Sequence, residues 1–169
     1  QFAGKPGRLQ PIATRVLMKL LYGARYARYD LLKAISLLAT MVTRWDEACD
    51  RALHKLMCYV NTSNDFTLQG FIGDDRKELH VDLHTDADLA GCPHTAKSSN
   101  GIFVAFSGPN SFFPVNAQSK KQEAISHSTA EAEIVAAYNG VSSDGLPLLE
   151  CVSVLRRDKI GKLYFGEDS

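Results

Sequence analysis

The sequence lacks several features, and each absence excludes a class of protein. No apolar run approaches the roughly 20 residues that a membrane-spanning helix needs, so we expect no membrane span. The chain starts at Gln1 without a basic-then-apolar signal pattern, and we expect an intracellular fragment, cytoplasmic or nuclear. The 4 cysteines form no C-x-x-C pair, which argues against a structural zinc site and favours free thiols.

The chain also lacks a net charge, yet its charges are unevenly distributed. There are 19 Lys and Arg against 19 Asp and Glu. Residues 1–60 hold ten basic and four acidic side chains, a net of +6, whereas residues 61–169 hold nine and fifteen, a net of −6. This asymmetry fits a nucleic-acid-contacting segment beside a metal-binding domain. Ordinary solvated helix faces are the alternative explanation.

Hydrophobic spacing predicts that a helical segment comes first. At 169 residues with 45% apolar residues, the chain is long enough for one domain with a substantial appendage. Apolar residues at helical intervals predict helices over 12–27, 30–41 and 46–60. A short strand is expected over 67–72. These elements make up a first segment, residues 1–75.

The remaining residues, 76–169, change period and predict a mixed α/β domain. Alternating apolar and polar residues predict a strand over 79–86. The further expected elements are strands over 101–106 and 111–118, helices over 129–144 and from 148 to about 157, and a strand over 162–166. Pro114 indicates that its strand is an edge strand or contains a bulge. A helical crossover before the last strand should make that strand parallel to the first.

Two carboxylates near the start of the predicted helix have different expected roles. The sequence Ser128-Thr129-Ala130-Glu131 matches a capping box, in which the Ser hydroxyl bonds the Glu amide and the Glu reaches back to the cap amide. Glu133 lies about 200° further round the helix. Its face holds the small residues Ala130, Ala137 and Gly140. Such a carboxylate can approach a sheet closely, where a metal ion would remove the cost of burying its charge; an exposed surface Glu is the alternative.

Further candidate residues lie at strand ends. Asp86 ends the first predicted strand, and Asp168 follows the last one, which should lie beside it. Carboxylates on neighbouring elements are suited to binding divalent cations. Asp88 is expected in the turn that follows. Lys120 and Lys121 precede the helix and can contact a phosphate backbone, although simple solvation also explains a pair of lysines.

Several segments resemble one known family. Residues 84–91 (HTDADLAG) are similar to the "SDADWAG" segment of copia-type retrotransposon polyproteins. Residues 119–122 (SKKQ) and 128–133 (STAEAE) are similar to their "SSKKQ…SSTEAEY" segment. Both segments belong to the ribonuclease H domain that follows the reverse transcriptase. Residues 162–169 (KLYFGEDS) are similar to the strand "LYCDNQSA", which carries the third acidic residue of that family.

The first segment resembles the same polyproteins. Residues 20–30 (LLYGARYARYD) are similar to "LLYLARATRPD", and residues 52–60 (ALHKLMCYV) to "ALKRVLRYLKGT". The resemblance therefore covers nearly the whole chain. It implies that residues 1–75 are a reverse-transcriptase tail or connection segment. It also implies that residues 76–169 are a ribonuclease H-like domain, incomplete at its C-terminus.

The resemblance implies a site and a chemistry. Asp86 matches the first catalytic aspartate, Glu133 the catalytic glutamate and Asp168 the third carboxylate, with Glu167 as a rival for the third position. The family's fold implies a ribonuclease H-like mixed sheet, with strands one to three antiparallel and a later strand parallel, and a helix that bears Glu133. Its chemistry implies two Mg²⁺ ions held by these carboxylates, one activating a water and one stabilising the leaving 3′ oxygen. The substrate is the RNA strand of an RNA–DNA hybrid, recognised by shape and 2′-hydroxyls.

The chain departs from the family's pattern in three places. Leu89 stands where the family usually has Trp, Gly166 and Glu167 intrude near the third aspartate, and the sequence stops before the last helix and the fourth acid. Two hypotheses follow. The chain is either a metal-dependent ribonuclease H, or an inactive, truncated or domesticated fragment. Such a fragment would serve as a structural or interaction subunit of a polyprotein or larger assembly.

Overall fold

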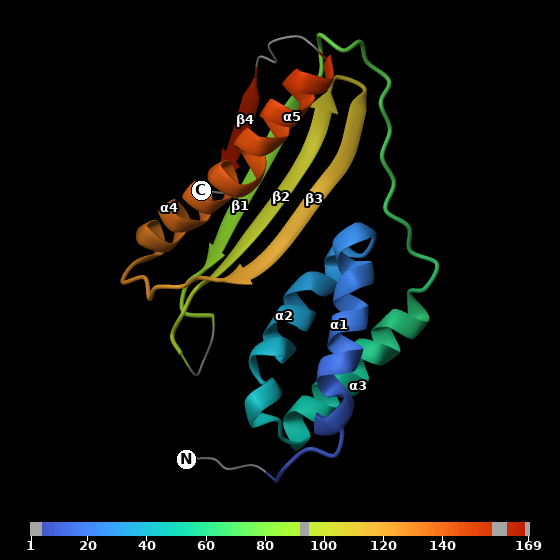
Figure 1. The fold of residues 1–169 in the computed structure, drawn as a ribbon, viewed down its shortest axis with the longest axis vertical. Coiled ribbons are helices and arrows are strands. Elements are labelled where there is room, and N and C mark those ends of the chain that lie inside the picture. Colours follow the sequence, from blue (N-terminus) through green and yellow to red (C-terminus); the bar gives the residue numbers. More distant parts are fainter. Residues whose placement is uncertain (1–4, 92–94, 157–161, 168–169) are drawn as a thin grey trace. The chain divides into compact units, whose positions relative to one another are not determined.

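The computed structural model describes residues 5–91, 95–156 and 162–167 (Figure 1). Two compact units divide the chain, Gln1–Leu68 and Gln69–Ser169. Residues 69–75 therefore group with the second unit, whereas the sequence analysis put them in the first segment. The expected strand over 67–72 is reduced to one bridge, in which the N–H groups of Phe71 and Phe112 donate to each other's carbonyls at 2.8 and 2.9 Å.

The first unit is helical, as predicted. It contains α1 (Gln10–Tyr26), η1 (Tyr29–Leu31), α2 (Leu32–Thr40), η2 (Val42–Arg44) and α3 (Glu47–Thr62). The helices bury a shared apolar core that includes Leu17, Ile35 and Leu53. Asp46 caps α3, because its side chain accepts a hydrogen bond from the Cys49 amide at 2.8 Å.

The second unit contains a mixed four-stranded sheet. Its strands are β1 (His80–Asp88), β2 (Ser99–Gly108), β3 (Ser111–Lys121) and β4 (Leu163–Glu167), in the order β3-β2-β1-β4. The β1–β2 and β2–β3 pairs are antiparallel and the β1–β4 pair is parallel, which confirms the predicted arrangement. Pro114 lies on edge strand β3, next to a register shift between Val104 and Ala105.

The helices of this unit form one nearly continuous rod along the sheet (Figure 1). The rod consists of α4 (Thr129–Gly140), the π-helix η3 (Val141–Gly145) and α5 (Leu146–Arg156). The predicted helices over 129–144 and from 148 leave a break at residues 145–147, and that break is absent because η3 runs directly into α5. Pro147 is the second residue of α5, a first-turn position at which a missing N–H is tolerated. A change from α-helix to π-helix at Val141 therefore takes the place of the expected break.

The core of the sheet unit lies between β1, β2 and the helical rod. Val81, Leu83, Ile102 and Val104 form its buried centre. Val141, Leu148, Leu149 and Leu163 pack against that centre. The strand alternation that was predicted for residues 79–86 is confirmed, since β1 alternates between buried and more exposed positions throughout. This alternation sets the direction of the candidate acidic side chains.

Candidate functional site

The acidic end of β1 extends further than predicted. Asp86 pairs with Gly101 of β2, and the strand continues to Asp88 rather than ending at Asp86. Thr85 and Ala87 are buried, whereas Asp86 and Asp88 are exposed on the opposite face. Asp88 is the last residue of the strand, and its carbonyl accepts a hydrogen bond from the Gly91 amide at 3.3 Å. Asp86 therefore lies on the polar face, as the alternation predicts.

Small residues bring α4 close to β1. Ala132, Ala136 and Gly140 are buried at intervals of four residues, and both alanines cluster with Ala87. A Cβ at Gly140 would lie 2.5 Å from Thr85 Cγ2, so glycine permits this close approach. Ala132 and Ala136 thus lie by Ala87, and Gly140 lies by Thr85. Therefore α4 runs antiparallel to β1, and its first turns lie at the acidic end of the strand.

The small-residue face differs from the one expected. Ala130 is exposed and Ala137 is half-buried, so they do not form the contact with the sheet. Round the helix, Ala132, Ala136 and Gly140 lie about 100°, 60° and 20° from Glu133, all on one side of it. Glu133 therefore borders the contact rather than lying at its centre.

Glu131 has the structural role that local chemistry predicts. The Ser128 hydroxyl accepts a hydrogen bond from the Glu131 amide at 3.1 Å. The Glu131 carboxylate accepts one from the His127 amide at 2.7 Å, one residue before the cap rather than at the cap itself. Both bonds satisfy donors at the start of α4, which fixes the helix beginning at Thr129.

Glu133 is half-buried, and one of its carboxylate oxygens, Oε2, is fully buried. Val135 and Asn139 lie on the other flank of α4, where they line a groove with residues of β2 and β3. Since β4 lies on the other side of β1 from β2, the geometry directs Glu133 toward the β4 side. The hydroxyl of Thr85 is also buried, and no described residue shares a hydrogen bond with it.

The fit of these residues to a metal ion rests on two carboxylates. Carboxylate oxygens are the ligands that Mg²⁺ prefers. Asp86 and Glu133 lie at the same end of β1, but Asp86 is on the face away from α4. No three His, Cys, Asp or Glu side chains within residues 5–91, 95–156 and 162–167 are grouped to hold a metal. Asp168 lies outside the described residues, and Glu167 ends β4 paired with Thr85. The metal site therefore stays a prediction.

Lys120 and Lys121 line the groove on the β2–β3 side of α4. The groove has a volume of about 350 Å³. Its polar walls include Gln118 and Asn139, and the ring of Tyr138 lies at its edge, 72% exposed. Two lysines beside amide donors suit contact with phosphate oxygens. The groove and Glu133 lie on opposite flanks of the same helix.

Sequence reasoning missed the hydrogen bonds that position α4. The buried Gln122 side chain donates to Asn100 Oδ1 at 2.6 Å and to the Ala132 carbonyl at 2.9 Å. Its oxygen accepts from the Ser126 hydroxyl at 2.9 Å. These bonds join the loop before α4 to β2 and to the helix itself. A single Gln is usually exposed, so the residue type gave no signal of this role.

A second missed group surrounds the π-helix. The Asp144 carboxylate is buried and accepts hydrogen bonds from Asn116 at 2.5 Å, Gln118 at 2.9 Å and the Ser143 hydroxyl at 2.5 Å. Its partners are therefore neutral donors. π-helical turns often occur at functional positions. Here the turn joins β3 to the helical rod.

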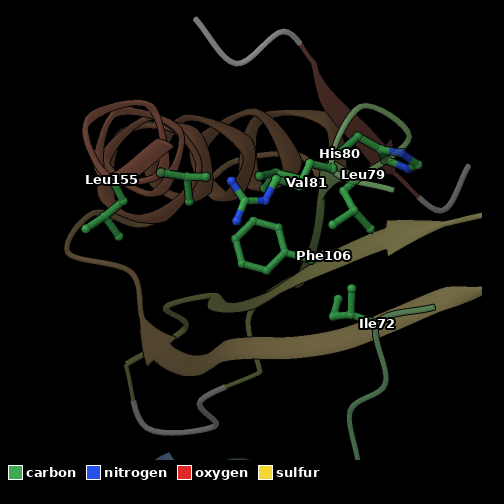
Figure 2. A pocket seen from close by; sticks show the side chains of 8 residues that line it. Ile72, Leu79, His80, Val81, Phe106 and Leu155 are labelled. Carbon is green, nitrogen blue, oxygen red and sulfur yellow. The ribbon is translucent and has the colours of Figure 1, made fainter. Parts of the chain in front are cut away.

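An apolar pocket of about 330 Å³ lies near the other end of β1 (Figure 2). Val81 and Phe106 belong to the sheet, and Leu155 of α5 lies across from them. His80 lies at the Leu79 side of the pocket, and its Nε2 atom lies 3.2 Å from a carboxylate oxygen of Asp82. Neither Asp86 nor Glu133 lines this pocket.

Comparison with known proteins identifies no relative of this chain. No model of a known protein family matches the chain, and searches of curated proteins and of solved structures find no match. None of the helices in the described ranges is long and apolar enough to cross a membrane. The structure thus defines a helical unit followed by a mixed α/β unit with a four-stranded sheet.

Proposed function

We propose that the sheet unit is a ribonuclease H-like domain of retroelement origin. Its activity is metal-dependent hydrolysis of the RNA strand in RNA–DNA hybrids. One observation carries the proposal: α4 packs antiparallel on β1, so that Glu133 and Asp86 share one end of the strand. These are the two elements on which the family-like segments, residues 84–91 and 128–133, fall. A parallel β4 beside β1 supports the same reading.

The proposed roles follow from the chemistry of each side chain. Asp86, Glu133 and Asp168 would hold Mg²⁺ through their carboxylates, and the metal would supply an activated water and charge neutralisation at the scissile phosphate. Lys120 and Lys121 bind phosphates of the hybrid. Gln122 holds the start of α4 against β2 and thereby acts as a positioning residue for Glu133.

Hydrolysis of a labelled RNA–DNA hybrid with and without Mg²⁺ tests the proposal. The proteins compared are this chain, a C-terminally extended chain, and Glu133→Gln and Glu131→Gln in the active form. We expect Glu133→Gln to lower the cleavage rate at least about a hundredfold, the scale for removing one transition-state contact. Glu131→Gln removes the same charge two residues away but keeps a side chain suited to the capping box. It should retain most of the activity.

Two results would overturn the assignment. Absence of cleavage by the extended chain, when circular dichroism shows it folded, refutes the nuclease. Equal losses in Glu131→Gln and Glu133→Gln refute the site and indicate damage to α4.

The second candidate function is an inactive fragment that serves as an interaction subunit. The position of Asp86 on the face away from α4 favours it, because two carboxylates on opposite faces share one ion less readily. A folded extended chain that binds the hybrid without cutting it is the expected outcome for this candidate.

A further inference from the structure

Helix α1 of the first unit has an exposed face that its packing does not explain. Its 17 residues include Arg15, Lys19 and Arg25 but no Asp or Glu. Tyr22 and Tyr26 are 71% and 70% exposed, and their ring centroids lie 5.1 Å apart. Two large aromatic rings therefore contact each other in solvent rather than in the core.

The exposed side chains of α1 lie along one line. At about 100° per residue, Arg15, Lys19, Tyr22 and Tyr26 fall within about 60° of one another. Leu17, which is fully buried, faces the other way. We call these four residues the α1 stripe. It covers 11 residue steps, or about 16 Å at roughly 1.5 Å per residue.

The acidic side chains of the unit are largely used in its own structure. Asp30 accepts hydrogen bonds from Arg28 and from the Tyr59 hydroxyl. Asp46 caps α3, and Asp50 accepts from the Trp45 ring N–H at 2.7 Å. Residues 1–68 hold ten Lys and Arg against five Asp and Glu, a net charge of +5. The surface charge of the unit therefore favours an anionic partner.

Two observations favour nucleic acid over a membrane surface. A helix that lies in a membrane interface inserts an apolar face, but the apolar face of α1, with Ala13, Leu17 and Ala24, is buried in the unit. Exposed aromatic rings next to cations are instead the pattern of single-strand binding, in which bases stack on the rings and phosphates contact Lys and Arg.

We propose that the α1 stripe binds single-stranded nucleic acid. Tyr22 and Tyr26 stack on bases, and Arg15 and Lys19 contact phosphates. Two rings and two cations over about 16 Å suit a short single-stranded segment of a few nucleotides. This goes beyond the proposed nuclease, because the stripe lies in the other unit and needs no metal-binding carboxylate.

Fluorescence anisotropy of a labelled oligothymidylate with the full chain, measured over a range of salt, tests the stripe. Changing both tyrosines, Tyr22→Ser with Tyr26→Ser, should weaken binding at least about thirtyfold, because each of the two stacked bases contributes roughly 1 kcal/mol or more. It should leave the salt dependence unchanged. Changing both cations, Arg15→Gln with Lys19→Gln, should reduce the slope of log K against log salt by about 1.4.

The matched control removes two exposed cations from α3, Arg51→Gln with Lys55→Gln. It should change the affinity less than either stripe variant, and the salt slope less than the Arg15→Gln, Lys19→Gln variant. Equal effects in the control overturn the proposal, as does absence of binding at low salt. Binding to phosphatidylserine vesicles but not to the oligonucleotide also overturns it. Glu133→Gln separates the two proposals, because it should lower the hydrolysis rate at least about a hundredfold and leave oligothymidylate binding intact.

Discussion

The two units hold their helices in place by different chemistry. In the helical unit, Arg28 pairs with Asp30 at 2.8 Å and donates to the Ser63 carbonyl at 2.8 Å. Its guanidinium also lies 5.7 Å from the Tyr59 ring centroid and 5.6 Å from that of Phe66. This single charged side chain joins the ends of α1 and α3.

The sheet unit uses small residues and neutral donors for the same purpose. Ala132, Ala136 and Gly140 let α4 approach β1, and amide groups surround Asp144. Its candidate acid Asp86 stays exposed on the sheet. The comparison teaches that the acids of the helical unit serve its structure, which leaves cations at its surface. An acid of the sheet unit remains available for a ligand.

The largest expected effects test whether the two units are stable independently. Leu17 and Leu83 are each fully buried, one in either unit. Leu17→Ala should lower the free energy of unfolding of the helical unit by about 2–5 kcal/mol, and Leu83→Ala that of the sheet unit by a similar amount. Trp45, the only tryptophan, reports the first unit by fluorescence, and amide hydrogen exchange reports the second. If Leu83→Ala shifts the Trp45 transition as much as Leu17→Ala does, the units unfold as one.

The effect of salt on stability should distinguish the hydrogen bonds of Arg28 in the helical unit from those of Asp144 in the sheet unit. Arg28→Ala and Asp144→Ala should each cost about 1–3 kcal/mol, because each leaves hydrogen-bonding groups without partners. Asp30 is 36% exposed at its side chain, so high salt should screen its pair with Arg28 and shrink the cost of Arg28→Ala. The cost of Asp144→Ala should not change, because its partners are neutral. Urea unfolding at low and high salt measures both costs, and equal salt dependence would contradict the distinction.

Much of the fold was predictable because its signals are local. Helical spacing predicted the three helices of the first unit. Alternation predicted strand β1 and the position of Asp86 on its polar face. The rule for crossover connections gave the parallel β4. The capping of α4 by Ser128 followed from four adjacent residues. In each case the sequence pattern and the interactions that form the element involve residues close together in the chain.

The errors arose where contacts distant in sequence decide the structure. Gly145 and Pro147 are local turn signals, but Asp144 is held by Asn116 and Gln118 of β3, and the helix continues through a π-turn. Likewise Gln122 bonds to a residue 22 positions away, which no spacing rule reveals. For the site, Asp86 and Glu133 were predicted near each other, and the packing of α4 puts them at one end of β1. Alternation puts Asp86 on the polar face of β1, so its position away from α4 follows from the packing of that helix on the buried face.

The smallest expected effect concerns pH and the helical unit. The hydrogen bond from the Cys49 amide lowers the pKa of the Asp46 carboxyl below its ordinary value of 3.8. A carboxyl whose pKa is lower in the folded state stabilises the protein above its unfolded-state pKa. That stabilisation is lost as the pH falls through the folded-state pKa.

Asp46→Asn keeps an equally good N-cap, so stability at neutral pH should change little. Its urea midpoint, followed by Trp45 fluorescence, should fall less than that of the parent protein between neutral pH and about pH 3. An equal fall in both proteins would mean that other acids, such as Asp30 and Asp50, whose pKa values are also lowered, carry the acid sensitivity of this unit.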